Sequence, residues 1–153
     1  MQLKLRIILN VKEDVLRDIV IDSGTSLLEL SKIISTEFGF DSSEISTFHK
    51  TDDNWEQLDE IKIFKIDDKD EIMDNIPISN FFISKNDKLI FIYDFLNYWT
   101  FFIELHEIGD FINDDSKYFI TNSIGEVPEE APSNIFNVSD KITETDFDDN
   151  QID

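Results

Sequence analysis

Hydrophobic and polar residues alternate along the first segment of the chain, as they do in a strand that buries one face. The alternating apolar positions are Leu3, Leu5, Ile7, Leu9 and Val11. Every second side chain of a strand points to the same side, so these five would share one buried face. Residues 15–21 form a second apolar run, and the charged residues 12–14 between the two runs suit a turn. The pattern predicts an antiparallel hairpin.

The spacing of apolar residues changes to that of a helix after residue 25. Ser26 precedes Glu29 by three positions, which is the spacing of a capping box at a helix start. Gly39 stands where a left-handed residue commonly ends a helix. The apolar positions between these two signals are Leu27, Leu30, Ile34 and Phe38. We expect a helix at about 26–38 that packs this stripe on a sheet.

Strand-like patterns return in the second half of the chain. Strands are expected at 45–50, 88–95, 99–108 and 118–124, with another strand or an irregular edge at 61–64. Residues 88–95 are apolar on both faces, which is typical of an interior strand. Pro77 is expected to open a single helical turn over 78–82. These elements predict an α+β fold: a mostly antiparallel sheet, one main helix packed on it and a short second helical turn.

The composition divides the chain near its C-terminal end. A length of 153 residues suits one domain. After Gly125, two of the three prolines follow at positions 128 and 132, and the last residues are polar and acidic. We therefore expect a single α+β domain over 1–132 and an acidic, mobile tail over 133–153.

Acidic residues outnumber basic ones, 34 to 13, and give a net charge of −21. Phosphate backbones and anionic lipids are bound through lysine and arginine, so direct nucleic-acid or membrane binding is not expected. The N-terminal segment lacks the features of a signal peptide, and the cytoplasm is the expected compartment. The acidity serves solubility, forms a docking surface for a basic protein partner, or mimics a nucleic acid.

Few side chains can support metal or nucleophile chemistry. Cysteine is absent, which excludes disulfides, thiolate nucleophiles and Cys-ligated metals. The two histidines, His49 and His106, lie in strand-like segments, and we expect both at the surface or the rim. The acidic residues 67–74 lack the glycine and glutamate spacing of a calcium loop. We therefore predict neither a metal site nor a cofactor.

Aromatic residues supply the predicted binding positions. Tyr98 occupies the predicted turn between the strands at 88–95 and 99–108, and Trp99 follows it. Trp55 lies in an acidic turn at 51–57. Clustered exposed aromatics are typical of interfaces, so these three residues are the predicted binding set.

Carboxylates near the same turn are the only candidates for catalysis. Asp94 would act as the acid or base of an enzyme centred on residues 93–99. Glu104 and Glu126 would be its partners. No motif fixes the geometry of these three residues, so the sequence favours a non-enzymatic role.

Landmarks from one end of the chain to the other follow the order known from one family. The residues that mark them are Thr25-Ser26-Leu27-Leu28-Glu29-Leu30, Phe48, Phe91-Ile92-Tyr93-Asp94-Phe95, Trp99, Ile103-Glu104-Leu105, Gly125-Glu126 and Pro128-Glu129. Over residues 3–130 they resemble the plasmid pRiA4b ORF-3-like family, which carries the label of a resolvase-like passenger of an insertion element. The stretch 52–56 is similar to an acidic subgroup of that family. The resemblance implies a fold but no defined activity.

The chain departs from the family pattern at several positions. Leu96 and Asn97 stand where the family has Gly-Asp, and Ser46 stands where it has His. The cysteines and paired glycines of the family's Gly-Glu segment are missing. A metal or catalytic site that the family held in that segment would therefore be absent here.

These observations lead to one hypothesis and two alternatives. The leading hypothesis is a non-enzymatic interaction or accessory module of the cytoplasm. The alternatives are a carboxylate-based enzyme at residues 93–99 and an acidic nucleic-acid mimic. The oligomeric state cannot be read from this sequence.

Overall fold

The chain begins with the predicted hairpin. The computed structural model describes residues 1–41, 44–61, 76–112 and 116–132. In it, β1 (Gln2–Leu9) and β2 (Leu16–Asp22) pair antiparallel, with Leu5 opposite Ile19. Leu3, Leu5, Ile7 and Leu9 of β1 are buried and the residues between them are half-buried, as the sequence pattern predicts.

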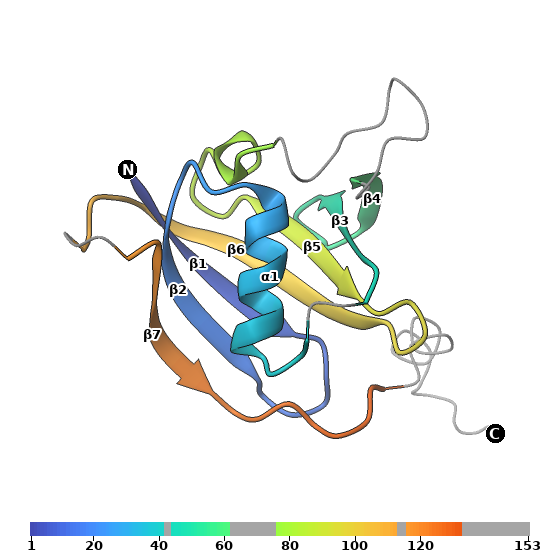
Figure 1. Ribbon diagram of the computed structural model, residues 1–153. Coiled ribbons are helices and arrows are strands. Elements are labelled where there is room, and N and C mark those ends of the chain that lie inside the picture. The colour runs from blue at the N-terminus through green and yellow to red at the C-terminus, as the bar shows by residue number, and fades with distance from the viewer. Residues whose placement is uncertain (42–43, 62–75, 113–115, 133–153) are drawn as a thin grey trace.

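The predicted helix follows the hairpin and crosses one face of the sheet (Figure 1). α1 (Leu27–Glu37) begins after Ser26, whose hydroxyl oxygen accepts a hydrogen bond from the backbone N–H of Glu29 at 3.1 Å. This bond satisfies one of the free N–H groups at the helix start. Gly39 adopts the left-handed conformation expected at the helix end, with a φ of 82°.

The remaining strands complete one antiparallel sheet. They are β3 (Ser46–Thr51), β4 (Gln57–Ile61), β5 (Lys88–Tyr93), β6 (Trp99–Gly109) and β7 (Tyr118–Ile124). The strand order is β4-β3-β5-β6-β1-β2-β7, so β6 joins the two halves by pairing with β1. β5 lies between β3 and β6, which confirms the interior position predicted for it. A short 3-10 helix, η2 (Ile78–Asn80), follows Pro77.

The hydrophobic core lies between α1 and the sheet face that it covers. The largest fully buried side chains there include Phe48, Phe82, Phe91 and Phe101. The opposite sheet face, called the open face below, carries ion pairs. Arg6 binds Asp18 at 2.8 Å and Lys88 binds Glu104 at 3.3 Å.

The prediction of an α+β fold class is wrong, because the structure is predominantly β. In the part of the chain that the structure describes, seven strands form one sheet, whereas the helices are one α-helix of 11 residues and one 3-10 turn. The sequence signals located the single helix correctly. The prediction of the fold class overestimated the contribution of this helix. A capping box indicates where a helix starts, but it does not indicate what fraction of the fold is helical.

Several expectations fall on residues outside the described ranges. These are the acidic residues 67–74, residues 62–64 of the strand or irregular edge expected at 61–64, and the acidic tail at 133–153. In the described part of the chain, no helix has both the length and the apolar character needed to cross a lipid bilayer.

Candidate functional site

A cleft lies beside the loop that joins β5 to β6, and we call it the hairpin cleft. Its volume is about 580 Å³, within the range of pockets that hold small ligands or side chains. Among the described residues that line it, five are acidic and three are aromatic, and none is lysine, arginine or histidine. The acidic residues are Asp41, Glu44, Asp94, Glu129 and Glu130, and the aromatic residues are Phe40, Tyr93 and Trp99.

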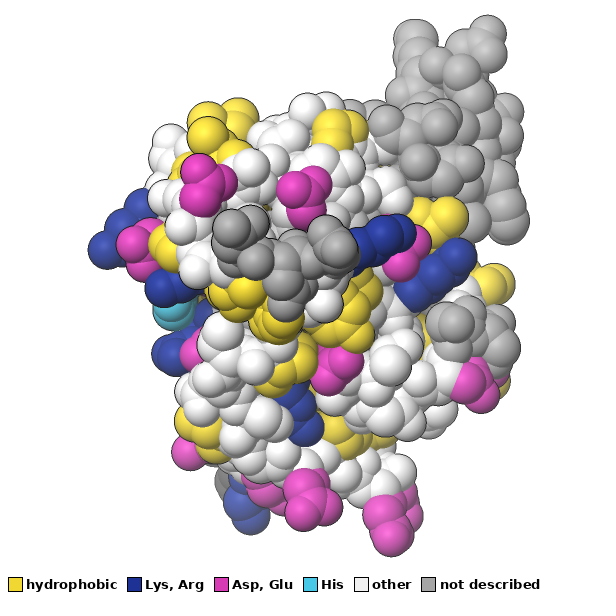
Figure 2. Space-filling view, turned by 60° about the vertical axis from the view of Figure 1, so that its left-hand side comes forward, with side chains coloured by type: hydrophobic (Ala, Val, Ile, Leu, Met, Phe, Trp, Pro, Cys, Tyr) yellow, Lys and Arg dark blue, Asp and Glu magenta, His cyan; other side chains and the backbone are white. Residues whose placement is uncertain are grey.

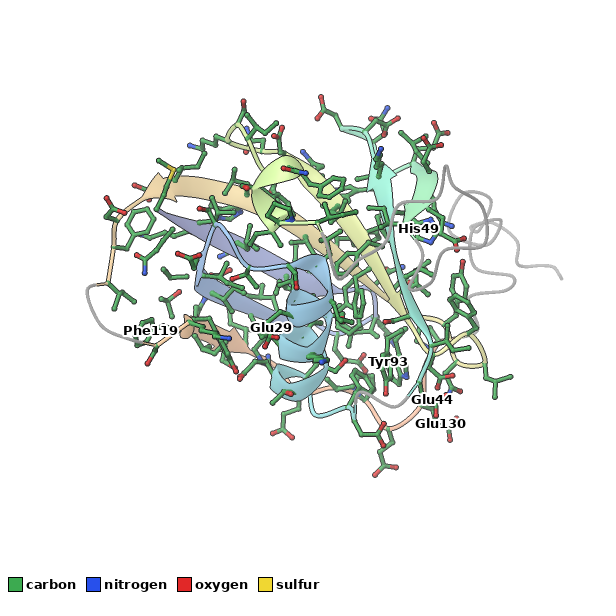
Figure 3. The ribbon with its side chains drawn as sticks, turned by 45° about the horizontal axis from the view of Figure 1, so that its top comes forward. Glu29, Glu44, His49, Tyr93, Phe119 and Glu130 are labelled. Carbon is green, nitrogen blue, oxygen red and sulfur yellow. The ribbon has the colours of Figure 1, made fainter. Side chains whose placement is uncertain are left out.

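Three segments that are distant in sequence build this cleft. The chain that follows α1 contributes Gly39, Phe40, Asp41 and Glu44. The hairpin contributes Tyr93 to Trp99, and residues 129–131 return to it after β7 (Figure 1). Figure 3 shows Glu44, Tyr93 and Glu130 at the same end of the sheet. The fold therefore gathers carboxylates that are up to about ninety positions apart, from 41 to 130.

Stacked aromatic rings form the floor of the hairpin cleft. The ring centroid of Phe40 lies 5.2 Å from that of Tyr93 and 5.0 Å from that of Trp99. Tyr93 and Trp99 are directly paired across β5 and β6. These contacts are within the range of favourable aromatic pairs. The floor is thus rigid and apolar, and the acidic side chains stand around it.

Tyr93 is fixed by a hydrogen bond at the edge of this floor. Its hydroxyl donates to the backbone carbonyl of Asp41 and lies 3.2 Å from the Asp41 Oδ1 atom. Burial and the neighbouring Asp41 raise the pKa of Tyr93 to about 12. The fold therefore favours the protonated phenol over the phenolate.

We expect Tyr93 to ionise about two pH units later than a free tyrosine, whose pKa is about 10. Because the folded pKa is raised, the stabilisation is complete below about pH 10 and is lost as the pH rises toward 12. The ionisation is measured by the near-ultraviolet absorbance of phenolate in pH titrations of wild type and of Tyr93→Phe. The absorbance of wild type minus that of the variant should rise with a midpoint near pH 12. A midpoint near 10 would show that the hydrogen bond to Asp41 does not form.

A second cleft adjoins the first at the end of α1, and we call it the helix-end cleft. Its volume is about 490 Å³, and it shares Gly39, Phe40, Trp99 and Glu129 with the hairpin cleft. Its other charged residues are Arg17, Glu37 and Glu126. Together the two clefts make a longer depression with one floor.

Arg17 holds the wall of the helix-end cleft in place. Its guanidinium donates to the backbone carbonyls of Ile124 at 3.0 Å and Gly125 at 3.1 Å. It also reaches the carbonyl of Glu37 at 3.4 Å and lies over the Phe38 ring at 4.9 Å. A cation near the last carbonyls of a helix is stabilising. Arg17 therefore ties the chain after β7 to the end of α1.

The comparisons with known proteins agree with this fold. The model of the plasmid pRiA4b ORF-3-like protein family matches residues 1–135, which is most of the chain. The chain belongs to the plasmid pRiA4b ORF-3-like family. No curated protein matches it. Its fold is similar to the crystal structure of a protein of unknown function from Methanosarcina mazei Go1, with a TM-score of 0.71 and 18% identity. That match covers 94% of this chain and 83% of the other, and it shows the fold alone.

In this family member, the three predicted catalytic carboxylates lie in three different places. Asp94 lines the hairpin cleft and Glu126 lines the helix-end cleft. Glu104 is on the open face of β6, within 3.3 Å of both Lys88 Nζ and His106 Nε2. A catalytic pair of Asp94 with Glu104 would have to act across the sheet.

The Asp94 carboxylate takes part in the hairpin turn. Its Oδ1 atom accepts a hydrogen bond from the Leu96 N–H at 3.1 Å, and its Oδ2 atom accepts one from the Asn97 side chain at 2.6 Å. Asp94 itself has a φ of 65°, a conformation that short polar side chains tolerate in turns. The two residues that depart from the family's Gly-Asp pattern, Leu96 and Asn97, are the ones that Asp94 binds.

The three predicted binding aromatics are divided between the two sides of the sheet. Trp99 is 5% exposed and lines both clefts, and Tyr98 precedes it at a φ of 58°. Trp55 lies on the open face, with its ring centroid 4.8 Å from that of Phe102 and 5.6 Å from Lys88 Nζ. Trp55 and Tyr98 are half-buried. Trp99 is thus the predicted binding residue that the fold places with the acidic groups.

The described residues contain no group of three or more metal-ligating side chains placed to hold a metal ion. The expectation of a surface position is wrong for His49, which is 5% exposed in β3. Burial lowers the pKa of His49, and its Nε2 atom lies 3.0 Å from the Thr47 hydroxyl. His106 is at the surface, beside Glu104.

Sequence reasoning missed most of the cleft. Phe40, Asp41 and Glu44 follow the helix in a stretch with no strong pattern, and Glu129 and Glu130 stand in a proline-containing segment. One signal was available: the aromatic hairpin and the Gly-Glu segment both belong to the family resemblance. Their contact in space depends on β7 pairing with β2, which no local pattern specifies.

Proposed function

We propose that this protein is a non-enzymatic interaction module of the cytoplasm, and that its two clefts hold a lysine- or arginine-bearing segment of a partner protein. One observation carries the proposal. The hairpin cleft combines five carboxylates with a floor of three aromatic rings, and no cationic side chain is found among the described residues that line it. An arginine or lysine side chain satisfies both features, because its charge pairs with carboxylates and its stem or guanidinium packs on rings.

The charge balance of the clefts supports a cationic occupant. Like charges that are gathered in one concave surface repel one another, and a bound cation removes that repulsion. The helix-end cleft adds Glu37 and Glu126, against the single cation Arg17, whose guanidinium is occupied by backbone carbonyls. An anionic ligand would be repelled by the carboxylates that line both clefts.

The shape of the clefts supports an extended segment. The two clefts share Phe40, Trp99 and Glu129, so a bound chain could run from one into the other without leaving the aromatic floor. Exposed ion pairs contribute about 1 kcal/mol or less each, so the affinity should come from several contacts and fall as salt rises.

We expect a fluorescein-labelled peptide of alternating arginine and glycine to bind the wild-type protein in a saturable way. The triple variant Glu44→Gln/Glu129→Gln/Glu130→Gln removes three carboxylates that line the hairpin cleft. Its affinity should fall about tenfold or more, since three exposed pairs at about 0.5 kcal/mol each amount to one order of magnitude. Fluorescence anisotropy at low salt measures both dissociation constants.

A second triple variant controls for net charge. Glu13→Gln/Glu56→Gln/Glu107→Gln also removes three charges, at exposed positions outside both clefts. It should bind the peptide within about twofold of wild type, a difference that corresponds to less than 0.5 kcal/mol. An equal loss in the two triple variants would mean that net charge, and not the cleft, attracts the peptide, and the proposal would fail.

A further inference from the structure

The sheet ends in two edge strands of very different character. β4 and β7 are the first and last strands of the order. β4 carries Asp59 and Glu60, both exposed. β7 reads Tyr-Phe-Ile-Thr-Asn-Ser-Ile and is the only strand of the described chain without an Asp, Glu, Lys, Arg or His side chain. In a protein of net charge −21, an uncharged edge is an exception that calls for a physical reason.

Charged edges have a known purpose in β proteins. An edge strand presents unpaired backbone N–H and C=O groups that can pair with another strand, and lysine, proline or inward charges normally prevent this. β4 follows that rule through its carboxylates. β7 has neither proline nor charge, and Ile124 at its end is 43% exposed.

The outer edge of β7 is open in the described part of the chain. Its inner edge pairs with β2 from Tyr118 to Ile124, with a bulge at Thr121. The bulge is anchored to β2, because the Thr121 hydroxyl donates to the Asp18 carbonyl at 3.3 Å and the Asn122 amide reaches the Asp18 carboxylate at 3.3 Å. Figure 2 turns this side toward the viewer, and uncharged groups and hydrophobic side chains fill most of the middle of the view.

We propose that β7 pairs with β7 of a second copy of this chain, so that one antiparallel sheet continues through a symmetric dimer. A second β7 suits this edge because a two-fold symmetric antiparallel pair sets its uncharged side chains against identical uncharged side chains. Two copies that each carry a net charge of −21 repel wherever carboxylates face each other, and β7 is the edge where none do. A basic partner would gain nothing at an uncharged strand and would favour the acidic clefts or β4.

The proposed dimer has a distinctive dependence on salt. The strand pair is short, so the interface is small and the association should be weak. Repulsion between the two acidic bodies opposes it, and salt screens that repulsion. The dimer should therefore strengthen as the ionic strength rises, whereas peptide binding in the acidic clefts should weaken. The two proposals thus fail or succeed separately.

Sedimentation velocity over a range of concentrations, at low and at high salt, tests the dimer. Wild type should show a monomer–dimer equilibrium that shifts toward dimer at high salt. Ile124→Lys places a charge on the exposed end of β7 and should weaken the dimer about tenfold or more, and Ser123→Lys should do the same. Leu58→Lys is the matched control, because Leu58 is 47% exposed on the other edge strand and the charge change is equal.

Three results would overturn the proposal. They are a wild type that stays monomeric at every concentration and salt, a dimer that persists in both β7 variants, and a dimer that Leu58→Lys disrupts equally. Circular dichroism of each variant shows that it is folded, and two separate β7 variants guard against misfolding of one.

Discussion

Gly125→Ala should lose about 2–5 kcal/mol of folding free energy. Gly125 has a φ of +75°, which costs an L-residue with a Cβ about 1–2 kcal/mol. A Cβ atom at this position would lie 2.0 Å from the carbonyl oxygen of Asp14 and 3.1 Å from the Val15 Cα atom. Both are backbone atoms, so the clash is relieved only by moving the chain, at a further cost of about 1–3 kcal/mol. Urea unfolding followed by circular dichroism measures the loss.

Gly39→Ala is the matched control for this prediction. Gly39 also has a positive φ, +82°, but no atom lies within 4 Å of its would-be Cβ. It should therefore lose only the conformational cost of about 1–2 kcal/mol. If the two variants were equally stable, the close approach of Gly125 to Asp14 would not exist in solution. The clash would also displace the Gly125 carbonyl that Arg17 binds, and so disturb the helix-end cleft.

Phe101→Ala should lose about 3–5 kcal/mol, the usual cost of removing a buried aromatic ring. Phe101 has no exposed surface, and its ring centroid lies 4.9 Å from that of Phe38 and 5.6 Å from that of Phe91. It therefore joins α1 to two central strands. A domain of this size has a total stability of about 5–15 kcal/mol, so the variant should unfold at markedly lower urea concentration.

Phe95→Ala removes the same aromatic ring as Phe101→Ala, but at a position where the ring is exposed to solvent. Phe95 lies in the loop between β5 and β6 and is 49% exposed, with its centroid 6.5 Å from that of Tyr98. Its loss should be below about 1 kcal/mol, as for most surface substitutions. Comparable losses at the two positions would contradict the packing described for α1 against the sheet.

Local patterns predicted the elements of this fold well because their causes are local. The capping box at Ser26, the left-handed Gly39 and the alternation in 99–108 each reflect contacts within a few residues. The strand Tyr118–Ile124 appears with the bounds that the sequence predicts. The fold class was wrong because the relative weight of helix and sheet depends on how many strands join one sheet, which no single segment specifies.

The site was much harder to predict because it depends on long-range pairing. Trp99 was predicted from the residues next to it in the sequence. Glu129 and Glu130 come close to it only because β7, which precedes them, pairs with β2. Trp55, which was predicted to act with Trp99, lies on the other side of the sheet for a simple reason. Trp55 packs on Phe102, and Phe102 points to the opposite side of β6 from Trp99 and Phe101, as neighbours in a strand must.

The pairing of β1 with β6 also has a consequence for the time at which the protein can fold. β1 precedes the strand that it meets here, Trp99–Gly109, by about ninety residues of chain. Until β6 and then β7 are synthesised, the first hairpin lacks its neighbours on both sides, and the segments β3 to β5 cannot join it. Native structure that depends on such distant pairs forms slowly. The nascent chain must therefore carry the first hairpin with open strand edges until the segments of β6 and β7 have been synthesised, and open edges are sites where other chains can pair.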